Sequence, residues 1–147
     1  MDAMGLGGEV AIAGTNDDSA MLSPLAMEQN VGVIARVPFD EGSLTGAITE
    51  STTFQGREFR AFYFRGDRKK QVAEHIGPLR RDLGVEANLA DVALRFCLSH
   101  PAVSSVIPGM RTRRHAESNT SLSDMGSLPP ETLAILKRHA WNRNFYS

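Results

Sequence analysis

The chain has 147 residues, of which 41% are hydrophobic and 22% are charged, as is ordinary for one globular domain. Its 16 lysine and arginine residues nearly balance 17 aspartate and glutamate residues, so no overall field draws it onto nucleic acid or an anionic membrane. The single cysteine, Cys97, excludes an internal disulfide and a cysteine-based metal cluster. We expect a cytoplasmic protein with no metal site, no signal peptide and no run of roughly 20 apolar residues that could span a membrane.

The first 18 residues indicate a flexible leader with at most one short strand. Residues 5–8 are rich in glycine, but a phosphate-binding loop should follow a strand and nothing precedes this one. Residues 10–13 could form the short strand, and a helix is predicted from about Met21 up to Gln29. The folded domain is therefore expected to cover residues 19–147.

Two apolar runs predict buried parallel strands. Residues 31–37 are almost continuously apolar, which is typical of strands covered on both faces. Residues 103–107 are short and rich in β-branched side chains, and Pro108 and Gly109 break the run. Ligand sites of parallel α/β proteins lie beyond the carboxyl ends of the strands, so the loops after these two runs are candidate binding loops.

A basic turn follows the second run. Thr112 offers a side-chain oxygen that could cap a helix whose first three residues are all basic. The exposed N–H groups and the dipole of such a helix favour an anion. Arg111, Arg114 and His115 could add charge-assisted hydrogen bonds. The segment predicts a phosphate site, and a solvated basic turn is the alternative explanation of the same spacing.

Helical periodicity accounts for most of the remaining chain. Helices are predicted over residues 67–83, from Asn88 to about residue 98, and from Pro129 onwards. Pro78 should kink or divide the first of them. Cys97 is interpreted as a core residue of the second. Strands that alternate with helices indicate a parallel α/β fold.

Residues 47–66 have no sustained period. Phenylalanine and tyrosine residues alternate there with arginine residues, a composition that can stack on nucleic-acid bases. Because the net charge is balanced, we favour an aromatic loop buried beneath the fold.

Several segments resemble bacterial aldo-keto reductases. The run from Gly32 to Gly46 is similar to the seventh strand and following loop of that family, and the run from Leu98 to Met110 is similar to its eighth strand. The segments Ala93–Phe96, Asn119, 123–124 and 128–131 continue the similarity, which covers roughly residues 20–143. The resemblance implies a partial (β/α)8 (TIM) barrel that comprises about the last two to three β/α units, because a full barrel takes ~250 residues.

In that family these two loops hold NADPH. The resemblance therefore implies a cofactor site formed by Val37, Pro38, Phe39, Gly42, Leu44, Gly109, Met110, Arg111, His115 and Asn119. The first five would lie along the pyrophosphate, and the others would hold the adenosine and its 2′-phosphate. The family often has serine in place of Val37, arginine or glutamine in place of His115, and glutamate in place of Ser118. These departures bear on the affinity and on the preference for NADP over NAD.

The resemblance also implies NADPH-dependent carbonyl–alcohol oxidoreductase chemistry, but no catalytic residue is assigned. The family's catalytic Asp, Tyr, Lys and His lie in the first half of its barrel, for which this chain has no counterpart. Tyr63 and Tyr146 fall in segments unlike the catalytic motif, so no general acid is identified. We expect an incomplete aldo-keto reductase, which would take a small carbonyl substrate only if the barrel were completed.

Three alternatives remain open. One is a non-catalytic NADP-binding or regulatory module. Another is a half-barrel that self-associates, because a partial barrel exposes its inner face and its strand edges. The third is an unrelated phosphate-binding α/β domain, which would bind simple phosphates as well as NADPH.

Overall fold

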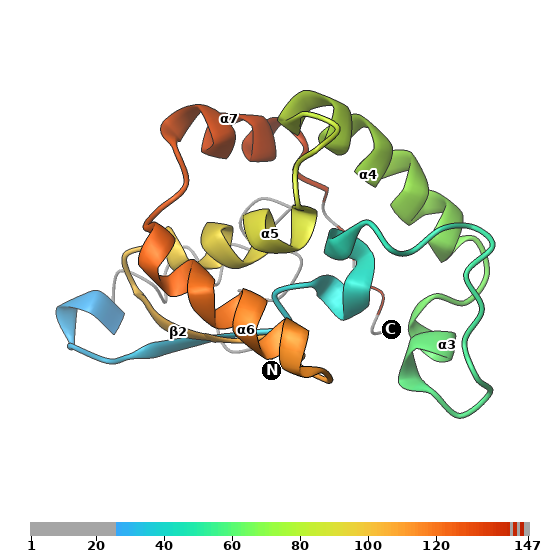
Figure 1. Cartoon of the computed structure of the whole chain (residues 1–147), viewed down its shortest axis with the longest axis horizontal. Helices are drawn as coiled ribbons and strands as arrows, with labels where there is room; N and C mark the ends of the chain where they lie inside the picture. Colours follow the sequence, from blue (N-terminus) through green and yellow to red (C-terminus); the bar gives the residue numbers. More distant parts are fainter. Residues whose placement is uncertain (1–25, 142, 144, 146–147) are drawn as a thin grey trace.

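The structure is a computed structural model that describes residues 26–141, 143 and 145. Within these residues each of two strands is followed by a series of helices (Figure 1). The elements are β1 (Val33–Arg36), the 3-10 helix η2 (Asp40–Thr45), α3 (Phe59–Tyr63), α4 (Arg68–Leu83), α5 (Leu89–Leu98), β2 (Val103–Ile107), α6 (Arg113–Ser121), the 3-10 helix η3 (Leu122–Met125) and α7 (Pro130–Arg138). The predicted leader and the possible strand at residues 10–13 lie outside the described residues. Residues 26–28 are helical, at the end of the helix predicted from Met21.

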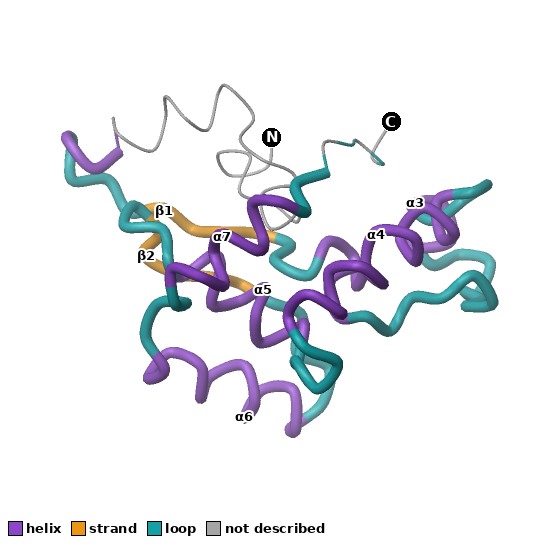
Figure 2. The backbone as a smooth tube through the Cα atoms, turned by 90° about the horizontal axis from the view of Figure 1, so that it is seen from above, coloured by secondary structure: helices purple, strands orange, loops and turns teal. Residues whose placement is uncertain are grey.

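β1 and β2 form a parallel pair, which confirms the strands predicted from the two apolar runs. Ile34 pairs with Ser105, and Arg36 pairs with Ile107. Figure 2 shows the two strands side by side. Because they are parallel and in register at their carboxyl ends, the loops that follow them leave the sheet at the same edge.

The two faces of this sheet differ in burial. One face packs on α5 through a cluster of buried residues, Ala26, Val33, Ala35, Cys97 and Ala102. On β1 the pattern alternates strictly, and Ile34 is 50% exposed. At the end of β2, Ile107 is 53% exposed. The prediction that the first run is covered on both faces is therefore wrong, because the described chain supplies helices to one face only.

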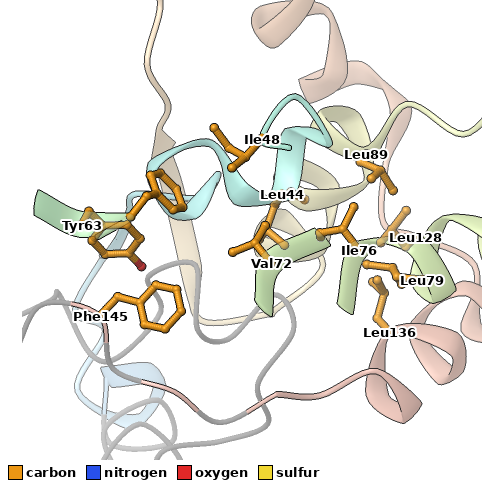
Figure 3. Packing of buried hydrophobic residues seen from close by; sticks show 12 residues of the cluster. Leu44, Ile48, Tyr63, Val72, Ile76, Leu79, Leu89, Leu128, Leu136 and Phe145 are labelled. Atoms are coloured by element: carbon orange, nitrogen blue, oxygen red, sulfur yellow. The ribbon is translucent and has the colours of Figure 1, made fainter. Parts of the chain in front are cut away.

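The larger core lies between α4, α5, α7 and the loop after β1. Val72, Ile76 and Leu79 of α4 point into it at helical spacing (Figure 3). Leu136 of α7 and Leu44 of η2 belong to the same cluster. Full burial of such a side chain contributes about 1.5–3 kcal/mol, so this core ties the first binding loop firmly to the helices.

α4 is one continuous helix through Pro78, so the alternative in which the proline divides it is wrong. The ring removes one backbone donor, and the packing of the apolar face on either side of it holds the helix together. Gly84 follows the helix at φ 97°, and the helix ends at Leu83, as the predicted range of 67–83 has it.

The aromatic segment is only partly buried. Tyr63 and Phe64 are 0% and 2% exposed, and they belong to the larger core. Phe59 and Phe62 of α3 are 49% and 47% exposed. The prediction of a buried aromatic loop therefore holds for only part of the segment, because the short helix α3 directs its aromatic side chains to both sides.

Candidate functional site

A cleft of about 870 Å³ opens beyond the carboxyl ends of the two strands. Arg36 and Ile107, the last residues of β1 and β2, both line it. The loop after each strand forms one part of the wall, and the start of α3 and the N-terminus of α5 complete it. This position is where parallel α/β proteins bind their ligands, and the volume lies within the roughly 300–1,000 Å³ of small-molecule and cofactor sites.

The cleft brings together most of the residues predicted to bind the cofactor. Those that line it are Val37, Pro38, Phe39, Gly42, Gly109, Arg111, His115 and Asn119. Two others do not. Leu44 is 3% exposed and lies in the larger core, and Met110 is 50% exposed outside the cleft. Leu44 is therefore placed to anchor the first loop rather than to present its side chain to a ligand.

The first loop has an unusual backbone. Val37, Asp40 and Glu41 have φ values of 52°, 49° and 55°, and Gly42 follows at 108°. Only glycine adopts this region without strain, and each other residue there costs about 1–3 kcal/mol. Such conformations persist where the surrounding structure fixes them, and they concentrate at ligand sites.

The second loop leads into α6, and the predicted cap is confirmed. The backbone N–H of His115 donates to Thr112 Oγ1 at 3.1 Å. Asn119 Nδ2 donates to the carbonyl oxygen of Gly109 at 3.4 Å and so ties the helix back to the loop. Arg111 and Arg114 are exposed, and neither has an ion-pair partner within the described part of the chain. The helix dipole and these cations make this wall suitable for an anion.

The opposite wall is polar and partly acidic. Asn88 Oδ1 accepts from the backbone N–H of Ala90 at 3.1 Å and caps α5. Beside it, burial raises the pKa of Asp91, against the hydrogen bond from Asn88 that lowers it. Glu58 forms an ion pair with Arg60 at the start of α3. The cleft thus presents exposed cations at the start of α6, and both acceptors and the paired Arg60 on the opposite wall, a combination that suits a ligand with phosphate and hydroxyl groups.

Sequence reasoning missed this opposite wall. The sequence predicts Asn88 and Asp91 only as the start of a helix, and Glu58 and Phe59 fall in the segment interpreted as an aromatic loop. These residues reach the cleft because α5 and α3 pack around the first loop, and no local pattern carries that information. The position of Asn88 at a helix N-terminus was the one available signal, since such ends often line ligand sites.

Comparison with known proteins identifies the family. The Aldo/keto reductase family model matches residues 8–140, so the chain belongs to the aldo/keto reductase family. The holo form of aldo-keto reductase AKR11C1 from Bacillus halodurans is similar in structure, with a TM-score of 0.58 and 21% identity over 83% of this chain. Its apo form gives a TM-score of 0.54 and 23% identity over 80% of this chain. No curated protein sequence matches the chain.

The chain spans 37% of the length of that solved relative. At this identity the similarity shows the fold alone. The fold is α/β and corresponds to part of a (β/α)8 barrel, and in the described residues its sheet has two parallel strands. None of the helices in the described ranges is long and apolar enough to cross a membrane. Among the same residues, no group of three or more histidine, cysteine or acidic side chains is arranged to hold a metal ion.

Proposed function

We propose that the chain binds NADPH in the cleft between the two loops. The observation that carries the proposal is that the loops after two adjacent parallel strands meet there and bring together eight residues predicted to contact the cofactor. Membership of the aldo/keto reductase family, whose relatives include an oxidoreductase solved in a holo form, supports it. The pyrophosphate would lie along the first loop and the 2′-phosphate at the start of α6.

The residues present fit these groups. Arg111 and Arg114 would donate charge-assisted hydrogen bonds to the 2′-phosphate, and the first N–H groups of α6 would add to them. His115 lies one residue further along the same wall. The acceptors on the opposite wall would face hydroxyl or amide groups of the nucleotide. NADPH, when bound, supplies the hydride that reduces a carbonyl.

We propose that hydride transfer requires a general acid that the described part of this chain does not place in the cleft. Tyr63, the one tyrosine among the described residues, is fully buried and does not line the cleft. It therefore cannot protonate a carbonyl oxygen there as a general acid would. We propose a cofactor-binding chain that is inactive alone, and a small carbonyl substrate that binds only when the barrel is completed. The lone buried cysteine supports a cytoplasmic location.

The test is a titration with NADPH, followed by nucleotide fluorescence and by melting temperature. A hydrogen bond to a charged group contributes about 1.5–3 kcal/mol, so Arg111→Ala should raise the Kd about tenfold or more. It should raise the Kd for NADH, which lacks the 2′-phosphate, much less. Arg113→Ala is the matched control, because Arg113 pairs with Glu117 at 2.6 Å and does not line the cleft. It removes the same charge and should leave the Kd almost unchanged.

Two outcomes would overturn the proposal. One is no saturable binding at millimolar NADPH. The other is equal displacement of the nucleotide by inorganic phosphate, which would favour a simple phosphate-binding domain.

A second proposal concerns assembly. Ile34 and Ile107 are half exposed on the open face of the sheet, at the position where a full barrel would bury them in its interior. We propose that this face mediates self-association of the chain, because exposed apolar surface and open strand edges favour association.

A further inference from the structure

We propose that Arg143, in the C-terminal tail, is a positioning residue that holds the first binding loop through Asp40. The inference rests on the proposed cofactor site. Phe39 and Glu41 line the cleft, whereas Asp40, which lies between them, does not. Its side chain turns inward and is 1% exposed. A charged side chain buried within a binding loop needs partners, and they come from distant parts of the chain.

Each oxygen of the Asp40 carboxylate has a partner. Tyr63 donates its hydroxyl hydrogen to Oδ1 at 2.5 Å. Arg143 forms an ion pair with Oδ2, and its second guanidinium nitrogen, Nη1, donates to the Tyr63 hydroxyl oxygen at 3.0 Å. The Arg143 side chain is only 6% exposed. The three groups thus form one closed buried network between the loop, α3 and the tail.

The two described residues that flank Arg143, Trp141 and Phe145, both pack on the rest of the fold. Trp141 stacks on His75 of α4, with 3.7 Å between ring centroids and 6° between planes. Phe145 is 5% exposed and packs edge-on against Tyr63 at 5.5 Å, and Figure 3 shows the two rings adjacent at one end of the core. The guanidinium of Arg143 also lies over the rings of Trp141 and Phe145, at 4.5 and 4.3 Å. These contacts help to hold Arg143 in place beside Asp40, in addition to the ion pair itself.

The network acts on the most strained part of the first loop. Asp40 and Glu41 both have positive φ, and the backbone hydrogen bonds of this turn are local ones, such as Gly42 N–H to Phe39 O at 2.9 Å. Local bonds alone do not select a conformation that two non-glycine residues disfavour. Fixing the Asp40 side chain from the far end of the chain selects it. Because Glu41 and Gly42 then face the cleft already ordered, binding does not have to order them.

The experiment compares wild type with Arg143→Met, and measures amide hydrogen exchange over residues 37–46 together with the NADPH Kd. We expect Arg143→Met to raise exchange in this loop and to raise the Kd at least tenfold. Arg143→Lys keeps the positive charge, so its loop exchange and its Kd should lie between those of wild type and those of Arg143→Met. Asp40→Asn keeps the side-chain shape and removes the carboxylate charge, and it should reproduce the loosening if Arg143→Met folds poorly.

Arg68→Met is the matched control. Arg68 Nη1 donates to the carbonyl oxygens of Phe145 at 2.6 Å and of Tyr63 at 3.1 Å. This variant therefore loosens the same segment while it leaves both side-chain partners of Asp40, Tyr63 and Arg143, in place. It should lower the melting temperature and leave both loop exchange and Kd close to wild type. Equal loosening of the loop by Arg68→Met, or wild-type loop exchange in Arg143→Met, would overturn the inference. Loop loosening in Arg143→Met without NADPH binding by wild type would leave the inference standing and reject the proposed function.

Discussion

Cys97 illustrates, at the scale of single residues, how burial sets the chemistry of a side chain. It is 5% exposed beneath the sheet, which confirms its interpretation as a core residue. Burial raises the pKa of its thiol to about 11, from the ordinary value of 9.0. Because the thiolate is the reactive form, this cysteine is expected to be inert at neutral pH.

The raised pKa of Cys97 predicts a loss of stability at alkaline pH. The thiol of the unfolded chain ionises near pH 9 and that of the folded chain near pH 11, so the unfolded state binds fewer protons between these values. The free energy of unfolding should therefore fall as the pH rises, by up to about 1.4 kcal/mol per pH unit. Urea unfolding at pH 8, 9 and 10 measures this free energy, with Cys97→Ala as the control. An identical pH dependence of stability in wild type and Cys97→Ala would contradict the prediction.

Whether a contact in the site could be predicted depends on how far apart its two residues lie in the sequence. The Thr112 cap and the basic side chains after it were predictable, because a cap and the helix it starts are neighbours along the chain. The pair of Asp40 and Arg143 was not predictable, because 103 positions separate the two residues and the tail had no clear pattern. Glycine at position 42 was consistent with a tight loop, but nothing indicated that Asp40 and Glu41 would share its backbone region.

At the scale of elements, α5 and α6 begin with similar caps and differ in what they bury. α5 buries Leu89, Ala93, Leu94 and Cys97. α6 buries none of its residues and lies apart from the other helices in Figure 2. Apolar periodicity predicts α5, whereas the cap at Thr112 predicts α6. A cap does not show how much a helix contributes to the core, so the weak packing of α6 could not be predicted.

This difference predicts unequal effects of removing the two caps. Asn88→Ala should lower the free energy of unfolding by about 1 kcal/mol, because α5 is part of the cooperative core. Thr112→Ala removes a similar hydrogen bond, but it should fray α6 locally with little change in global stability. Urea unfolding measures the first effect, and amide hydrogen exchange over residues 113–121 measures the second. A global loss as large for Thr112→Ala as for Asn88→Ala would show that α6 is part of the core.

The sheet could be predicted in part. The two apolar runs gave the strands, and their alternation with helices gave the parallel arrangement. Burial on both faces was inferred from apolar composition, but composition alone does not show which elements pack on a strand. Ile34 is apolar and 50% exposed, because no described helix covers its side of the sheet.

At the scale of the whole molecule, the open sheet face predicts self-association. Light scattering should give a mass that rises with concentration. Ile34→Lys should reduce this association by placing a charge on the exposed face. Val85→Lys is the control, because Val85 is 70% exposed on the connection between α4 and α5, away from the sheet. A monodisperse monomer at all concentrations would reject the proposed association.

The central claim is that the two loops after the parallel strands form one NADPH site. Amide hydrogen exchange of the wild-type chain, with and without saturating NADPH, tests it most directly because it reports where the nucleotide acts. The account predicts that exchange slows in both segments, residues 37–46 and residues 109–119, and changes little in α7. Protection of neither segment, or protection confined to regions outside the cleft, would contradict it.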